Sequence, residues 1–177
     1  MIDLSIIPLH YCNLNCEFCY LGKLRQSKDV LEISSIKNVL DIYDVRVLDI
    51  YGGEITLLEP SYITKLVDEL KPYFNNEKIY ITSNALSIAK SKWLDYIKDG
   101  TIYPSFSYDI CRPNNDKIKA AIQEFDSFGL QYSVICLDIS DLDYEFLLSL
   151  SNMKSFSIKP FSKSKYMDDC EYASYMV

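Results

Sequence analysis

The sequence contains a single histidine, His10, among its 177 residues. This scarcity excludes mechanisms and metal sites that depend on several imidazoles. Basic residues are also few, because 18 Lys and Arg stand against 25 Asp and Glu, a net charge of −7. Proteins that bind nucleic acid present a basic surface to the phosphates, so this balance argues against a nucleic-acid partner.

Long hydrophobic runs are missing as well. No apolar stretch reaches the roughly 20 residues that a membrane-spanning helix requires. The first segment, MIDLSIIPLHYC, carries the acidic Asp3 and lacks the basic residues that open a secretory signal peptide. We therefore expect a cytoplasmic protein with no membrane partner. Hydrophobic residues make up 49% of the chain and charged residues 24%, as in one ordinary globular domain.

Short apolar runs alternate with helical patterns along the chain. In the helical stretches apolar residues recur at i, i+3, i+4 and i+7, which predicts one buried helical face. This alternation predicts a parallel sheet covered by helices, with the active site at the carboxyl ends of the strands. The strands are expected at 4–9, 45–51, 78–83, 102–109, 131–138 and 155–161, and the helices near 36–43, 63–70, 93–97, 118–125 and 142–150.

Three of the six cysteines, Cys12, Cys16 and Cys19, stand close together directly after the first predicted strand. In a cytoplasmic protein such a group indicates a metal or redox site, and thiolates suit iron–sulfur clusters, zinc or copper. Structural zinc sites and electron-transfer clusters take four ligands, but the other cysteines are scattered. Three cysteines leave one metal position open, as catalytic sites do. A zinc knuckle remains the alternative.

The spacing C-x3-C-x2-C, with Phe18 before the last cysteine, resembles the signature of the radical S-adenosylmethionine (radical SAM) superfamily. The resemblance implies that Cys12, Cys16 and Cys19 bind a [4Fe–4S] cluster whose open iron chelates the amino and carboxylate groups of S-adenosylmethionine (SAM). One electron, from a donor such as flavodoxin or ferredoxin, would then break a C–S bond of SAM. The resulting 5′-deoxyadenosyl radical abstracts hydrogen from the substrate. By the same resemblance, Phe18 lies beside the adenine.

A second motif, Gly52-Gly53-Glu54, follows the second predicted strand. Two glycines allow the backbone to approach a ligand closely, and a carboxylate beside them can accept a charge-assisted hydrogen bond from an ammonium group. A plain strand-to-helix turn is the alternative. The motif resembles the family's GGE sequence, which receives the amino group of SAM. The family often continues with proline, whereas Ile55 follows here.

Polar residues also end the third and fourth predicted strands. Ser83 and Asn84 can bond a ribose or a carboxylate, or cap the helix that follows. Ser107 and Asp109 alternate along the fourth strand and its end, so we expect them to project to one side. The resemblance favours all four as cofactor contacts.

The same order of motifs resembles the family over residues 4–161. It implies an α/β fold, a six-stranded partial (β/α)6 barrel of TIM type with parallel strands and outer helices. We expect residues 1–161 to form this core domain and 162–177 a C-terminal tail, either mobile or cut from a longer chain. The roles of Cys111, just past the fourth strand, and Lys159, at the end of the sixth, stay open.

The run from Cys12 to Tyr20 is similar to family members that modify peptides and proteins. We therefore expect an oxygen-sensitive enzyme that acts on a peptide or protein side chain. The alternatives are an activase for glycyl-radical enzymes, an enzyme for small molecules or nucleotides, and a module that binds SAM or an iron–sulfur cluster without turnover. Formation of 5′-deoxyadenosine under reduction separates the enzymes from the binding module.

Overall fold

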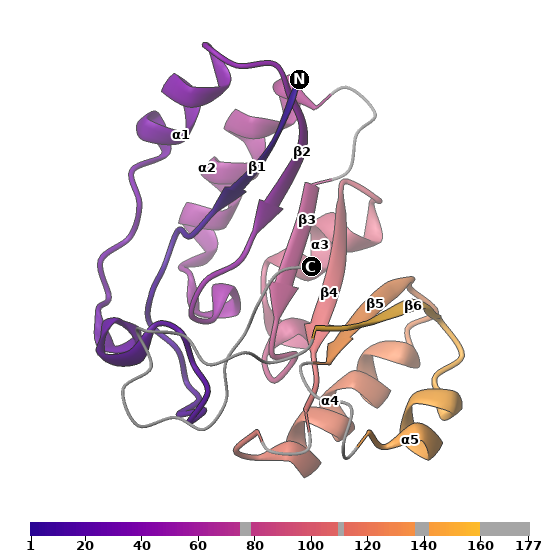
Figure 1. Ribbon diagram of the computed structural model, residues 1–177. Helices are drawn as coiled ribbons and strands as arrows, with labels where there is room; N and C mark the ends of the chain where they lie inside the picture. Colours follow the sequence, from indigo (N-terminus) through magenta and orange to yellow (C-terminus); the bar gives the residue numbers. More distant parts are fainter. Residues whose placement is uncertain (75–78, 110–111, 137–141, 160–177) are drawn as a thin grey trace.

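The computed structural model describes residues 1–74, 79–109, 112–136 and 142–159. Six parallel strands form one sheet in the order in which they occur in the chain (Figure 1). Within the described residues β6 does not pair with β1, so the sheet remains open, and the expected six-stranded partial barrel is confirmed. The strands are β1 (Ile2–Ile6), β2 (Val45–Ile50), β3 (Ile79–Ser83), β4 (Ile102–Ser107), β5 (Tyr132–Cys136) and β6 (Met153–Ile158).

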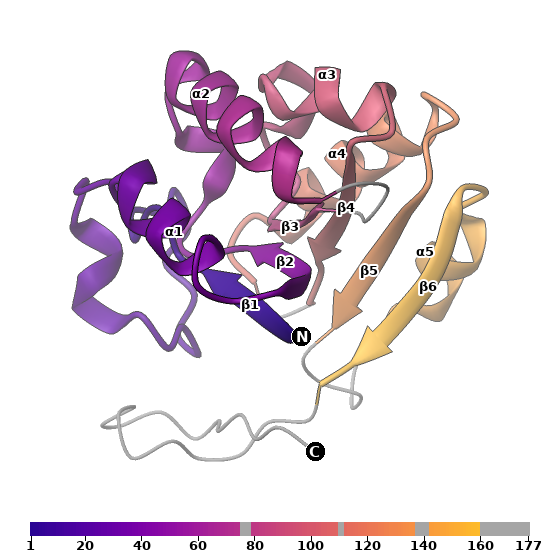
Figure 2. The same ribbon diagram turned by 90° about the horizontal axis from the view of Figure 1, so that it is seen from above.

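The helices lie on the outer side of the curved sheet (Figure 2). They are α1 (Ile33–Leu40), α2 (Pro60–Leu70), α3 (Trp93–Lys98), α4 (Asn115–Asp126) and α5 (Tyr144–Ser149). Pro60 opens α2, where its missing N–H leaves no helical bond unmade. Four short 3-10 turns complete the described structure: η1 (Gly22–Gln26), η2 (Ile55–Leu57), η3 (Lys71–Tyr73) and η4 (Ile88–Lys90). Each predicted strand and helix is present, with its ends displaced by a few residues.

The hydrophobic core lies between the sheet and these helices. Alternate residues of the central strands, among them Leu48, Ile81 and Phe106, are completely buried against apolar helix positions such as Leu66 and Ile118. Removing this apolar surface from water is the main favourable term in folding, at roughly 25 cal/mol per Å². The core thereby fixes where each strand ends, and with it the position of the polar residues that follow.

The other face of the sheet, which we call the inner face, carries hydroxyl groups. The strand register places Thr82, Ser105, Ser133 and Ser155 side by side on β3 to β6. Ser133 Oγ lies 2.8 Å from Ser155 Oγ and donates a 3.3 Å hydrogen bond to the Tyr103 hydroxyl. The open side of the sheet is therefore polar, in contrast to its helix-covered side.

The end of the described chain is less covered. On β6, Phe156 and Ile158 are 43% and 37% exposed, whereas Val134 and Cys136 on the neighbouring β5 are fully buried. The predicted tail, Cys111 and Cys170 lie outside the described residues. None of the helices in the described parts of the chain has both the length and the apolar character needed to cross a membrane.

Candidate functional site

The three clustered cysteines lie on the loop between β1 and α1, at the carboxyl edge of the sheet (Figure 1). The η1 turn packs back onto this loop. The Cys12 amide donates to the Arg25 carbonyl (3.1 Å), and Arg25 Nη1 donates to the Cys16 carbonyl (3.1 Å). Cys16 is buried, and Cys12 and Cys19 are half-buried. We refer to residues 9–19 as the cysteine loop.

Gly52 and Gly53 bring the cysteine loop onto the end of β2. The amides of Gly53 and Glu54 donate to the carbonyls of Leu9 (2.9 Å) and Tyr11 (2.8 Å). A Cβ on Gly53 would lie 2.1 Å from the His10 carbonyl oxygen, and one on Gly52 would lie 2.6 Å from that of Leu9. The close approach expected of these glycines is thus made to the chain's own backbone. Their contact with a cofactor stays a prediction.

Glu54 is a buried carboxylate surrounded by neutral donors. It is 1% exposed. Its Oε1 accepts hydrogen bonds from the Thr56 amide (3.0 Å), the Thr56 hydroxyl (2.7 Å) and the Ser83 hydroxyl (2.8 Å), and its Oε2 accepts one from the Asn84 amide (2.8 Å). Within the described residues no Lys, Arg or His forms an ion pair with it. Oε2 therefore retains capacity for a further donor.

Ser83 and Asn84 both donate to Glu54, and Asn84 also contacts the cysteine loop. Asn84 Nδ2 donates a 2.8 Å hydrogen bond to Asn13 Oδ1, which ties the end of β3 to the loop. The same two side chains also accept local bonds from the amides of Ala85 (3.0 Å) and Leu86 (3.1 Å). These are local turn bonds, because the next helical segment, η4, begins at Ile88 with Ser87 as its N-cap, so the capping alternative considered from the sequence is wrong.

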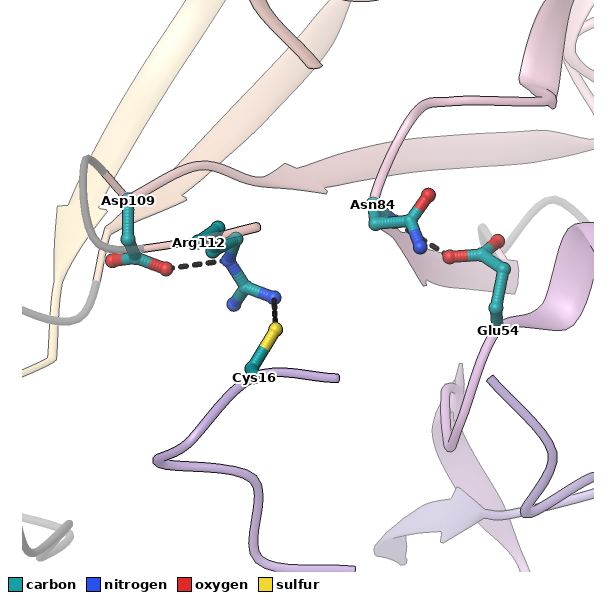
Figure 3. Close-up of polar contacts among 5 residues, drawn as sticks. All are labelled: Cys16, Glu54, Asn84, Asp109 and Arg112. Carbon is teal, nitrogen blue, oxygen red and sulfur yellow. Dashed lines mark hydrogen bonds and ion pairs between the residues drawn. The ribbon is translucent and has the colours of Figure 1, made fainter. Parts of the chain in front are cut away.

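Arg112 connects Cys16 with Asp109 and Phe18. Arg112 Nε donates to Asp109 Oδ2 at 2.6 Å, and its Nη1 donates to Cys16 Sγ at 3.7 Å (Figure 3). The guanidinium carbon lies 5.0 Å from the centre of the Phe18 ring, a cation–π distance. Asp109 follows β4 and Phe18 lies on the cysteine loop, so Arg112 links two parts of the chain that are remote in sequence.

Ser107 and Lys159 lie toward the inner face. Ser107, at the end of β4, is half-buried and faces Ile135 in the register with β5. Lys159 is exposed just after β6. Burial raises the pKa of Asp49, an inner-face residue of β2, and the charge of Lys159 partly opposes that rise. Lys159 therefore acts electrostatically on the Asp49 carboxylate, and its functional role stays open.

Burial also affects the thiols. It raises the pKa of Cys16 to about 11 and also that of Cys12, and the positive charge of Arg112 works in the opposite direction at both. Within the described residues no three His, Cys, Asp or Glu side chains are arranged to hold one metal ion. An iron–sulfur cubane makes a different demand, because each thiolate binds a separate iron and loses its proton on binding. Three thiols on one loop suit that demand.

The fold, together with the residues at the carboxyl edge of the sheet, indicates the class of protein to which the chain belongs. An open sheet of six parallel strands carries a three-cysteine loop and a buried glutamate at its carboxyl edge. The family model of the radical SAM superfamily matches residues 6–128. The chain therefore belongs to the radical SAM superfamily. Members of this family are enzymes that use a [4Fe–4S] cluster and SAM.

The individual proteins that this chain resembles match it at low sequence identity. A probable GTP 3′,8-cyclase of Sulfurisphaera tokodaii is 30% identical over 94 residues, which cover 51% of this chain and 29% of that protein. The fold is similar to SuiB of Streptococcus suis bound to the precursor peptide SuiA, with a TM-score of 0.66 and 22% identity over 91% of this chain and 40% of SuiB. It is also similar to anSMEcpe with bound AdoMet, with a TM-score of 0.68 and 18% identity. That match covers 94% of this chain and 56% of anSMEcpe. The chain thus matches little more than half of these proteins at most.

The structure brings most of the predicted site residues to one edge of the sheet, and it adds three that the sequence analysis missed. Thr56 donates twice to Glu54, Asn13 accepts from Asn84, and Arg112 contacts Cys16. Asn13 lies inside the cysteine motif, and Thr56 lies two residues after Glu54. Their closeness in sequence to these motifs is the signal that could have identified them. For Arg112 the only signal was its position three residues after Asp109.

Proposed function

We propose that residues 1–161 form the core of a radical SAM enzyme that modifies a peptide or protein side chain. In this proposal Cys12, Cys16 and Cys19 bind the [4Fe–4S] cluster. Together, cluster and SAM supply a one-electron cleavage that yields a 5′-deoxyadenosyl radical for hydrogen abstraction. The observation that carries the proposal is the buried Glu54 carboxylate, which has four neutral donors and spare capacity beside the cysteine loop.

In this arrangement the Glu54 carboxylate receives the amino group of SAM. A charge-assisted bond to a buried carboxylate is about twice as strong as a neutral one. Ser83 and Asn84 fix the orientation of that carboxylate through their hydrogen bonds to it. Gly52 and Gly53 hold the loop against the end of β2, which places the cysteine loop next to Glu54.

The remaining predicted residues take roles on either side of the cofactor. The Phe18 ring offers a flat apolar face to the adenine, with Arg112 already lying against it. Ser107 stands on the inner face, where its hydroxyl can bond a ribose or the substrate. Asp109 acts through Arg112, because its carboxylate is engaged by that guanidinium.

Two observations support a peptide substrate. The structural neighbour SuiB was crystallised with a precursor peptide. In this chain, the inner-face hydroxyls of Ser105, Ser133 and Ser155 could hydrogen-bond the amides of an extended peptide, whereas a wall of aliphatic side chains could not. The partner that supplies the electron is, in this proposal, a small one-electron carrier such as flavodoxin or ferredoxin in the cytoplasm.

A nucleotide is the second candidate substrate. The relative with 30% identity is described as a probable GTP 3′,8-cyclase. A face of hydroxyl groups also suits a ribose and its phosphates. Both candidate functions share the SAM cleavage step and differ only in the substrate from which the radical abstracts hydrogen.

The first experiment tests the cluster and SAM cleavage. The protein is reconstituted with iron and sulfide without oxygen, reduced with dithionite, and assayed with SAM for 5′-deoxyadenosine. Cys16→Ala should lose iron and sulfide, whereas Cys136→Ala, in the core of β5, should keep both. Zinc without sulfide in the wild type, or SAM bound without any 5′-deoxyadenosine, would contradict the proposed enzyme.

The second experiment separates the substrates. The reduced enzyme is incubated with SAM and either peptides encoded beside its gene or GTP, and products are followed by mass spectrometry. A peptide that changes mass only with active enzyme supports the first proposal. Conversion of GTP with unchanged peptides would favour the nucleotide enzyme instead.

A further inference from the structure

Arg112 is placed to influence the sulfur of Cys16. Its side chain is 12% exposed and that of its partner Asp109 is 2% exposed. Nε is held by the Asp109 carboxylate at 2.6 Å, which leaves Nη1 directed at Cys16 Sγ at 3.7 Å (Figure 3). An arginine suits this task because its planar guanidinium presents several N–H groups in a fixed geometry.

The three cysteine sulfurs differ in this respect. Within the described residues, an arginine donor contacts the sulfur of Cys16 but not those of Cys12 and Cys19. The Cys12 sulfur accepts a 3.4 Å bond from the Leu14 amide, a neutral donor. Within the described residues, the Cys16 sulfur therefore accepts a hydrogen bond from a buried, oriented positive charge, whereas the same charge acts on Cys12 only through space.

We propose that Arg112 raises the reduction potential of the cluster by hydrogen-bonding to Cys16 Sγ, with Asp109 holding it in position. The inference rests on the proposed assignment of Cys16 as a cluster ligand. Net charge, hydrogen bonds to the sulfurs and solvent exposure set the potentials of iron–sulfur clusters. Reduction takes one electron from an external donor and adds one negative charge to the cluster and its thiolates. A guanidinium at the sulfur stabilises that added charge.

The test is a redox titration of the reconstituted protein, followed by electron paramagnetic resonance, with iron and sulfide measured in parallel. Arg112→Gln removes the charge and should lower the reduction equilibrium constant about tenfold, which is about 59 mV toward more negative potential for a one-electron couple. Arg112→Lys keeps the charge but loses the planar fork, so we expect a smaller shift in the same direction. Arg46→Gln is the matched control, because Arg46 pairs with Asp3 on an exposed part of β1 and β2. Its midpoint should equal that of the wild type.

The outcomes separate this inference from the function on which it rests. If the wild type takes up no cluster, the ligand assignment fails and the inference with it. If the wild type loads and Arg112→Gln loads with an unchanged midpoint, the proposed function stands and the role of Arg112 is refuted. Loss of the cluster from both Arg112 variants would also refute it, because Arg112 would then be required for loading rather than for potential.

Discussion

Two buried carboxylates at the carboxyl edge of the sheet are satisfied in opposite ways. Asp109, after β4, is 4% exposed and pairs with the Arg112 guanidinium. Glu54, after β2, is 1% exposed and accepts bonds from four neutral donors. A buried charge is costly unless it is paired and hydrogen-bonded. Asp109 has its cation within the chain, whereas in the proposed function the amino group of SAM supplies the cation for Glu54.

Each carboxylate is also connected to the cysteine loop, by a separate route. Glu54 binds the Asn84 amide, and the Asn84 side chain binds Asn13 on the loop. Asp109 binds Arg112, which binds Cys16. Both carboxylates are therefore linked to the cysteine loop. A substitution can displace the whole loop, or it can remove one of the two links.

Displacing the whole loop should give the largest effect. In Gly53→Ala the new Cβ would stand 2.1 Å from the His10 carbonyl oxygen, a backbone atom that can move only with the loop. We expect the free energy of unfolding to fall by about 3 kcal/mol, as in severe overpacking. Both connections should fail together, so iron and sulfide should be lost after reconstitution. Urea denaturation and metal analysis measure the two effects.

Gly100→Ala is the matched control for this change. Gly100 has a φ of +79° and nothing within 4 Å of its missing Cβ. Only the cost of a left-handed backbone, about 1 kcal/mol, should appear, and the cluster should assemble normally. If Gly53→Ala bound iron and sulfide as well as Gly100→Ala, the loop would not depend on its contact with β2.

The contrast between the carboxylates predicts unequal effects on SAM affinity. Glu54→Gln keeps the shape of the side chain but removes the charge offered to an ammonium group. Losing a hydrogen bond to a charged group costs about 1.5–3 kcal/mol, so SAM should bind at least about tenfold more weakly. Asp109→Asn should weaken binding much less, because that carboxylate is occupied by Arg112. Anaerobic equilibrium dialysis of the loaded variants measures both.

Thermal unfolding of the same variants separates stability from affinity. Both substitutions disturb buried hydrogen bonds, so both should lower the melting temperature. Equal losses of SAM affinity in the two variants would contradict the distinction between the carboxylates. Asp109 would then be the direct cofactor contact that the sequence comparison with the family implied.

The elements of the fold were predictable because their signal is local. Alternating apolar runs and helical spacing, as at Ile63, Leu66 and Leu70, depend only on neighbours in the chain, and the structure buries these residues completely. The motifs at the ends of the strands were predictable for a related reason. Parallel strands in sequence order bring Glu54 and Asn84 to one edge whatever the loops do.

The contacts among these residues were not predictable, because they depend on how distant segments approach. No local pattern marks Arg112 as a partner of Cys16, 96 positions earlier in the chain. The two glycines show the same limit. The sequence predicted that a ligand comes close to these glycines, but the folded loop shows that the His10 carbonyl lies closest to Gly53.

Removing only the side-chain hydrogen bond between the loop and Asn84 should give the smallest effect, because the backbone bonds from Gly53 and Glu54 to the loop remain. Asn13→Ala removes the acceptor of the Asn84 side chain and leaves the link from Arg112 to Cys16 intact. One hydrogen bond contributes about 1 kcal/mol, so we expect a loss of that size in urea denaturation and faster loss of iron in air. Asn15→Ala, at another exposed position of the loop, is the control and should change neither. The midpoint potential should stay at the wild-type value in Asn13→Ala, because the charged donor at Cys16 is untouched. A shift in that potential would mean that the two connections are not independent.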